Sequence, residues 1–394
     1  MLESRIPIVI PVMLRFASLP PLSLYVHLPW CVRKCPYCDF NSHAARGAIP
    51  EQTYVDALLR DLEQELPRAA GRTVETIFLG GGTPSLFSPE SIARLLTGIR
   101  ARIAIAPNAE VTLEANPGTV DTERFKGFRD AGVNRLSIGI QSFDDDKLKA
   151  LGRIHGRAEA LRAAEAARAA GFDNFNLDLM FGLPEQTLEQ ALIDIRIAIE
   201  QQPTHLSVYQ LTVEPNTLFH AKPPVLPDDG ATWDMQQALQ ALLATNGYRQ
   251  YEVSAYAQSG RECRHNLNYW QFGDYLGIGA GAHGKLTDTD GITRRWKLKR
   301  PEDYLSKAGT PTVIGGEQRL TRADTIAEFM LNALRLTGGF PAALFTERTG
   351  LAPDAIETSL RHAEQQGLIA RNTTDIRLTE QGRRFLNNLI ELFI

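Results

Sequence analysis

Three cysteines lie close together near the start of the chain, at Cys31, Cys35 and Cys38, with the spacing CxxxCxxC. Thiolates are soft ligands that suit iron–sulfur clusters or zinc. A structural zinc ion needs a fourth protein ligand, for which His27 and His43 are the nearest histidines. A cubane 4Fe-4S cluster held by three cysteines instead leaves one iron free to bind a substrate or cofactor. The spacing favours this open cluster and leaves zinc as the alternative.

The elements that must position these cysteines alternate between short β-rich runs and amphipathic helical runs, such as 53–66 and 159–171. Alternation of this kind predicts parallel βα units, and therefore an α/β fold built on a partial (β/α)6 barrel. We expect its six strands at 23–28, 75–82, 109–118, 133–143, 172–184 and 204–215.

Polar and glycine-rich residues recur where the predicted strands end: at 80–83, at 114–118, and at Gln141, Asp178 and Thr212. The carboxyl ends of barrel strands form the face on which barrels of this type keep their sites. We therefore expect these residues to gather around one site together with the cysteines.

The remaining chain divides into three predicted segments. Residues 1–22 form an arm expected to be disordered, with Met13 as an alternative start to Met1. Residues 216–320 extend the barrel (23–215) and include a strand expected at 251–257. Residues 321–394 show three helices, a hairpin and a further helix, a winged-helix-like pattern. That last segment has eight arginines against nine acidic residues, which disfavours nucleic-acid binding.

Composition limits the classes of partner and compartment. The 394 residues carry a net charge of −4, so no overall positive field attracts nucleic acid or an anionic membrane. The apolar stretch 6–14 contains two prolines and is too short to span a bilayer, and it lacks the flanks of a signal peptide. Four cysteines, three of them crowded, do not form a secreted disulfide framework. We therefore expect a cytoplasmic protein with no transmembrane segment.

The cysteine spacing, with Tyr37 just before the last cysteine, resembles the radical S-adenosylmethionine (SAM) superfamily. The strings YVHLPWC, CPYCDFNSH, FLGGGTPS, EANPG, GIQSF and NLDLMFGLPEQ are similar to its oxygen-independent coproporphyrinogen oxidase group, and the similarity runs from about Leu22 across nearly the whole chain. The resemblance implies that SAM binds the open iron through its amino and carboxylate groups. It also implies that reduction of the cluster can cleave SAM to a 5′-deoxyadenosyl radical.

The residues that the resemblance assigns to SAM binding carry groups that can bind it. A glycine run at 80–82 exposes backbone carbonyls that can accept from the SAM ammonium. Glu114 and Asp178 are acceptors for ribose hydroxyls or the ammonium, whereas Gln141 and Arg153 suit the hydroxyls and the carboxylate. The resemblance implies SAM contacts at Tyr25, Gly81, Gly82, Thr83, Glu114, Gln141, Arg153, Asp178 and Thr212.

Two features separate the chain from the oxidases of that group. The oxidases carry a further cysteine two residues after the third, where Phe40 stands here, and a longer N-terminal arm. The string HNLNYW (265–270) instead resembles the HNxxYW motif of a heme chaperone subgroup. The heme-binding candidates that follow are His265, Asn266, Tyr269, Trp270 and Cys263.

A histidine can ligate heme iron, and aromatic rings can lie against a porphyrin. Alternatively, Tyr269 and Trp270 pack this segment against the barrel and His265 is a hydrogen-bonded structural histidine. His155 and His283 lie among glycines, where a ligand could approach, and are weaker candidates.

The resemblance implies a heme chaperone that passes heme to acceptor proteins such as membrane-bound respiratory enzymes, with an electron donor as a further partner. It would reach the inner membrane only through a partner, and a homodimer is compatible with the sequence. The first alternative is a SAM-dependent coproporphyrinogen III oxidase, against which Phe40 counts, and the second is a zinc-stabilised interaction protein. Whether the chain is an enzyme stays open.

Overall fold

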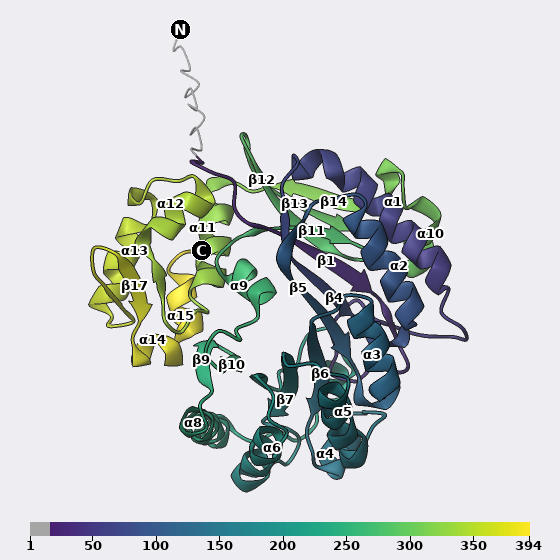
Figure 1. The fold of residues 1–394 in the computed structure, drawn as a ribbon. Helices are drawn as coiled ribbons and strands as arrows, with labels where there is room; N and C mark the ends of the chain where they lie inside the picture. The colour runs from purple at the N-terminus through teal and green to yellow at the C-terminus, as the bar shows by residue number, and fades with distance from the viewer. Residues whose placement is uncertain (1–15) are drawn as a thin grey trace.

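The computed structural model describes residues 16–394. The first fifteen residues of the predicted arm, and with them the choice between Met1 and Met13 as the start, lie outside the described residues. A curved sheet of twelve strands dominates the molecule, in the order β14-β13-β12-β11-β1-β4-β5-β6-β7-β8-β10-β9 (Figure 1). Its centre consists of six parallel neighbours, β1 (Leu22–Leu28), β4 (Val74–Gly81), β5 (Ile105–Ala115), β6 (Arg135–Gln141), β7 (Phe175–Phe181) and β8 (His205–Gln210). The predicted partial (β/α)6 barrel is confirmed.

Helices follow the barrel strands and cover the convex face of the sheet (Figure 1). Most begin at a side-chain cap: Ser88, Asp121, Asp144 and Thr187 each accept a hydrogen bond from a backbone N–H of the first turn. These helices are α1 (Glu51–Ala69), α2 (Pro89–Arg100), α3 (Thr122–Asp130), α4 (Asp145–Ala150), α5 (Arg157–Ala169) and α6 (Leu188–Glu200).

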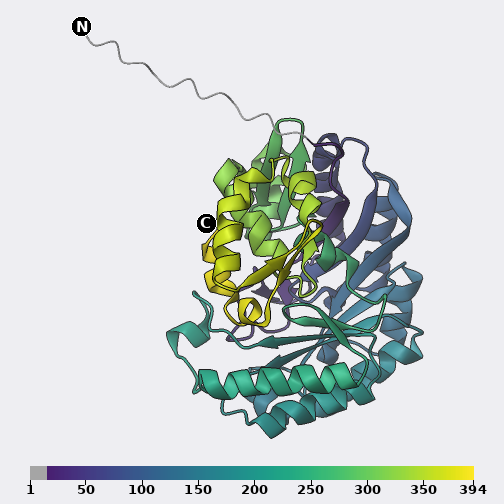
Figure 2. The same cartoon turned by 90° about the vertical axis from the view of Figure 1, so that its left-hand side faces the viewer.

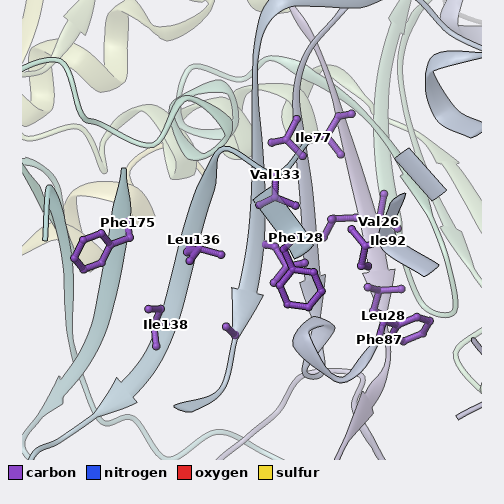
Figure 3. Close-up of a cluster of buried hydrophobic side chains, with 14 of the residues drawn as sticks. Val26, Leu28, Ile77, Phe87, Ile92, Phe128, Val133, Leu136, Ile138 and Phe175 are labelled. Atoms are coloured by element: carbon purple, nitrogen blue, oxygen red, sulfur yellow. The ribbon is translucent and has the colours of Figure 1, made fainter. Parts of the chain in front are cut away.

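The main core lies between the sheet and these helices (Figure 3). Val26, Leu28 and Ile77 project from the strands, and Ile92 and Phe128 project from the helices; all are fully buried. Burial of such side chains is worth about 1.5–3 kcal/mol each. The strands are thereby fixed, and their carboxyl ends are left free to carry polar residues.

The segment after the barrel lengthens the sheet at both edges. β11 (Asp274–Ile278) pairs parallel to β1, and β12 (His283–Asp288), β13 (Gly291–Lys297) and β14 (Ile314–Arg319) follow antiparallel. α8 (Asp229–Thr245) and α10 (Pro301–Lys307) pack near the two edges. Leu243, Leu276 and Leu286 belong to the same hydrophobic core as the barrel strands, so this segment is continuous with the barrel.

The prediction of one strand at 251–257 was wrong. The structure has a hairpin of two antiparallel strands, β9 (Arg249–Glu252) and β10 (Ala255–Ala257), at the edge beside β8. The chain turns at this point because the Glu252 carboxylate accepts a hydrogen bond from the Ser254 N–H (3.1 Å). An acceptor side chain two residues before the N–H favours a turn over continued strand pairing.

The C-terminal residues form a separate cluster of helices with a small sheet, as predicted for a winged-helix-like domain (Figure 2). Their core includes Phe329, Phe345 and Leu360 and is joined by Phe272 and Ile292 of the preceding segment. The elements are α11 (Arg322–Ala333), β15 (Phe340–Pro341), α12 (Ala342–Thr349), α13 (Asp354–Gln365), β16 (Ile369–Arg371), β17 (Asp375–Leu378), α14 (Glu380–Arg384) and α15 (Leu386–Glu391).

None of the helices in the described part of the chain has the length and apolar character needed to cross a membrane.

Candidate functional site

The three cysteines lie on the loop that follows β1. Two short parallel strands, β2 (Trp30–Cys31) and β3 (His43–Ala44), close this loop at its base. His27 fixes it to the barrel, because its Nε2 lies 2.8 Å from the Asn41 carbonyl oxygen and its Nδ1 lies 2.9 Å from the Tyr25 hydroxyl. Burial lowers the pKa of His27 to about 4, so the ring is neutral and donates from Nε2.

The donor set suits an iron–sulfur cluster. Cys31, Cys35 and Cys38 are free thiols that line one cavity of about 280 Å³. Burial raises the pKa of Cys31 and of Cys38, so these thiols need a bound cation to ionise near neutral pH. No three His, Cys, Asp or Glu side chains within residues 16–394 converge on a single metal ion. A cubane takes one thiolate per iron, so its cysteines need not converge on one point.

The glycines after β4 bring bare backbone to the same cavity. Gly81 has φ +115°, and a Cβ added there would lie 2.5 Å from the His27 ring. A Cβ on Gly82 would lie 2.6 Å from the Trp30 carbonyl oxygen. Only glycine fits at these positions, and the cysteine loop therefore packs directly on the end of β4.

Two half-buried carboxyls, Glu114 and Asp178, line the same cavity. Glu114, at the end of β5, accepts a hydrogen bond from the Gly81 N–H (3.0 Å). Burial and the charge of Asp178 raise the pKa of Glu114 to about 7. Burial also raises the pKa of Asp178, although its oxygens accept from the Asn176 amide (2.7 Å) and the Ser137 hydroxyl (3.0 Å). Both groups offer acceptor oxygens to a ligand rich in N–H and O–H donors.

Arg153 and Gln141 complete the cavity. The Arg153 guanidinium donates to the Gly139 carbonyl oxygen (2.8 Å) and to the Cys35 sulfur (3.6 Å), and its Nε has no hydrogen-bond partner among residues 16–394. An arginine with a free donor beside the cluster cysteines can bind a carboxylate. Gln141 has φ +72°, and its side-chain oxygen accepts from the Tyr209 hydroxyl (2.7 Å).

The structure brings together most of the residues that the resemblance carries over to SAM. Tyr25 lines the neighbouring cavity instead, and Thr212 is exposed, lines neither cavity and donates to the Glu214 carboxylate (2.8 Å). Asn116 lines the cysteine cavity too, as expected for the stretch 114–118, whereas residues missed from the sequence include Ser137, Gly139 and Tyr209. Gly139 and Tyr209 could have been found from their place near the carboxyl end of a barrel strand, whereas Ser137 lies in the first half of β6 and has no such signal. The residues assigned to SAM that line the cysteine cavity are Gly81, Gly82, Thr83, Glu114, Gln141, Arg153 and Asp178.

The HNLNYW segment forms a helix, α9 (Arg264–Trp270). It lies on the concave side of the sheet, in contact with β4 and α11 (Figure 1). The Glu110 carboxylate holds its first turn by accepting from the N–H groups of Arg264 and His265 (3.1 Å each).

His265 has no nitrogen free for iron in this structure. Its Nδ1 lies 2.7 Å from the Thr76 hydroxyl and its Nε2 lies 2.9 Å from the Tyr269 hydroxyl, and the residue is 1% exposed. Burial, with the nearby positive charge of Arg135, lowers the pKa of His265 to about 3. The geometry is that of a hydrogen-bonded structural histidine.

The other heme candidates around α9 are also mostly enclosed. Cys263 is fully buried, with its sulfur 3.5 Å from a Glu110 oxygen. The Trp270 ring lies beneath the Arg335 guanidinium, 4.4 Å from its centroid. Asn266 is partly exposed but lines neither cavity, whereas Tyr269 lines the larger of the two. Heme contact by these residues stays a prediction.

Comparison with known proteins places the chain in a family. A model of the radical SAM superfamily matches residues 25–196, and a model of the HemN C-terminal domain matches residues 320–385. The chain is 53% identical to the heme chaperone HemW of Escherichia coli (strain K12) and 54% identical to that of Haemophilus influenzae. Each match covers 96% of this chain and 99% of the relative. The chain belongs to the HemW family.

The HemW family relationship extends to the heme chaperone HemW of Bacillus subtilis, with 35% identity over 94% of this chain. Among solved structures, the coproporphyrinogen III oxidase HemN from Escherichia coli matches with a TM-score of 0.80 and 25% identity, over 95% of this chain and 90% of that one. The predicted resemblance is therefore confirmed down to the heme chaperone subgroup. Membership of the radical SAM superfamily implies a 4Fe-4S cluster and SAM. The zinc alternative is therefore set aside.

Proposed function

We propose that the protein is a heme chaperone, which binds heme and transfers it to an acceptor protein. The observation that carries this proposal is identity above 50% to two proteins named as heme chaperones, over nearly the whole length of both partners. Phe40, at the position of the oxidases' extra cysteine, supports the same conclusion.

The cluster and SAM are the proposed resident cofactors. Cys31, Cys35 and Cys38 would bind three irons of a 4Fe-4S cluster, which supplies an open iron for SAM and an electron for its cleavage. Arg153 would bind the SAM carboxylate, because its Nε has no partner in the described part of the chain and the side chain already lies against Cys35. Glu114 and Asp178 would accept hydrogen bonds from ribose hydroxyls or the ammonium.

An oxygen-independent coproporphyrinogen III oxidase is the second candidate function. The observation that favours it is the TM-score of 0.80 to a protein with that activity. In this case the barrel would oxidatively decarboxylate propionate side chains, with loss of CO2. The lack of the extra cysteine and the higher identity to heme chaperones argue against it.

The partners and location follow from the same proposal. The acceptors would be heme-dependent proteins such as respiratory enzymes of the inner membrane, and a reducing protein would supply the electron. The chaperone itself would work in the cytoplasm and approach the membrane only through its acceptor.

One anaerobic preparation with a reconstituted cluster separates the two functions. Heme titration, transfer to a heme-free acceptor and turnover of coproporphyrinogen III are measured on the same sample. A chaperone binds heme, passes it on and does not make protoporphyrinogen. Efficient turnover without heme uptake would refute the chaperone proposal and establish the oxidase.

A further inference from the structure

A second and larger cavity, of about 720 Å³, opens beside the cysteine cavity. The two cavities share a wall made of Cys38, Phe40, Ser42, Gly81 and Glu114. The residues assigned to SAM lie mostly in the smaller cavity, so the larger one has no ligand assigned to it. Its volume lies in the range of ~300–1,000 Å³ that is typical of sites for small molecules and cofactors.

Aromatic rings supply flat apolar surface in this cavity. Phe40 lies on the wall shared with the cysteine cavity, and 62% of its surface is exposed. Tyr269 and Tyr275 line the cavity from α9 and β11, with their rings edge to face at 4.6 Å. A planar macrocycle gains from contact with rings of this kind.

Two lysines provide positive charge at separate points of the lining. Lys34 comes from the cysteine loop and Lys299 from the segment after β13. The acidic residues Asp39, Glu114 and Glu214 also line the cavity, so a carboxylate is favoured only beside the two lysines. This arrangement suits a ligand that is largely apolar and carries a small number of carboxylates.

Three histidines line the cavity, and one of them has both ring nitrogens unbonded. His27 is engaged at both nitrogens, as described above, and His43 has its Nε2 3.3 Å from the Asn41 side-chain oxygen. His283, at the start of β12, stacks on the Trp296 ring at 6.0 Å. No group among residues 16–394 hydrogen-bonds to either of its ring nitrogens, and the residue is exposed.

The His283 imidazole is in the form that binds metals. Partial desolvation by the surrounding protein, followed by the positive charges of Arg294 and Lys299, lowers the pKa of His283 below the ordinary value of 6.5. The ring is therefore neutral near pH 7 and offers a nitrogen lone pair. His265, in contrast, is enclosed on α9 with both nitrogens occupied.

We propose that the larger cavity is the heme site, with His283 as the axial ligand, the rings of Phe40, Tyr269 and Tyr275 against the porphyrin, and Lys34 and Lys299 paired with its propionates. This proposal rests on the proposed heme chaperone function and names the site at which heme would bind. It places heme against the wall of the cluster site and assigns HNLNYW a mainly structural part, with Tyr269 as its contribution to the cavity.

The test is ferric heme titration of the full-length, cluster-reconstituted protein, followed by Soret absorbance and electron paramagnetic resonance. His283→Ala should weaken heme binding by about tenfold or more. His283→Cys should retain binding with the altered spectra of a thiolate ligand. Iron and sulfide contents should be unchanged in both variants, which shows that the cluster site is intact.

His362→Ala is the matched control, since His362 is an exposed histidine on α13, outside the cavity. Wild-type spectra and affinity in both His283 variants would overturn the proposal, as would loss of heme binding in a stably folded His265→Ala protein while His283→Ala binds normally. If the wild-type protein itself takes up no heme, the proposed function fails and not merely this assignment.

The propionate contacts are tested with a second ligand. The double variant Lys34→Ala/Lys299→Ala should weaken heme binding but leave binding of heme dimethyl ester, which has no carboxylates, unchanged. Equal weakening for both ligands would contradict the pairing. Lys307→Ala, on the exposed end of α10, controls for loss of charge elsewhere.

Discussion

Single residues at the cofactor cavity carry charges whose state depends on burial. The pKa of Glu114 is about 7, raised by burial and then by Asp178, whereas an unfolded glutamate has a pKa of ~4.3. The native state therefore holds this proton more strongly than the unfolded state. Without a ligand, ionising Glu114 therefore lowers the free energy of unfolding. This loss is absent below pH ~4.3, grows as the pH rises to about 7, and is constant above that.

Glu114→Gln should abolish the pH dependence of SAM binding that arises from this group. In the wild type, donors on SAM favour the carboxylate, so affinity should rise as the pH increases from about 6 to about 8. The variant should bind SAM more weakly and with little pH dependence. Anaerobic equilibrium dialysis measures both, and Glu123→Gln, an exposed glutamate on α3, serves as the control. Parallel pH profiles of variant and wild type would contradict this role.

His265→Ala should destabilise the fold, because it leaves the Thr76 and Tyr269 hydroxyls without their partner in a buried site. The expected loss is about 1–3 kcal/mol in the free energy of unfolding. Urea denaturation measures it, and His362→Ala should change stability by no more than ~0.5 kcal/mol. A midpoint equal to the wild type would show that His265 has no structural role.

At the level of elements, the first turn of α9 is capped by a residue of a barrel strand. Glu110 on β5 accepts from two N–H groups of the first turn of α9, and its oxygen also lies near the Cys263 sulfur. The N-cap residue Cys263 makes no side-chain cap, so the carboxylate takes over that function from a distant part of the chain.

Glu110→Ala should loosen α9 and lower stability by about 1.5–3 kcal/mol, the range for hydrogen bonds to a charged group. Hydrogen exchange should become faster in residues 264–270. Glu75→Ala removes an exposed ion pair to the same helix, with Arg264 (3.5 Å), and should cost at most about 1 kcal/mol. Unchanged exchange in α9 of the Glu110 variant would disprove the cap.

At the scale of the whole molecule, a buried ion cluster joins the added strands to the barrel. Lys297 on β13 donates to Asp61 (2.5 Å) and to Glu65 (2.6 Å), both on α1, and Tyr304 on α10 donates to Asp61 (2.9 Å). These groups come from α1 and from two consecutive elements much later in the chain, β13 and α10, and they are nearly inaccessible to solvent. The cluster therefore fixes the far edge of the sheet against the first barrel helix.

Lys297→Ala should destabilise the protein by about 3–5 kcal/mol, because the buried Asp61 carboxylate loses its cation, whereas Glu65 keeps its ion pairs with Arg68 and Arg295 (3.2 Å each). The loss should shrink at lower pH, where protonated carboxyls no longer need a positive partner. Chemical denaturation at two pH values measures both effects, with the exposed Lys307→Ala as the control. A loss that is small or independent of pH would contradict the assignment.

The barrel, the radical SAM cofactor class and most residues of the cysteine cavity could be predicted from the sequence alone. Strand periodicity is local, and the carboxyl ends of parallel strands must meet on one face, so Glu114, Gln141 and Asp178 could be expected beside the cysteines. The spacing of the cysteines is likewise local, because one short loop carries all three.

The accessibility of the histidines and the extent of the sheet, in contrast, could be read only from the folded chain. His265 stands in the motif that suggested heme, but Thr76, 189 residues earlier in the chain, occupies one of its nitrogens. From the sequence His283 was only a weaker candidate, but in the structure it begins an added strand and lines the larger cavity. Burial and hydrogen-bond partners depend on contacts between distant segments, and these contacts leave no local pattern in the sequence.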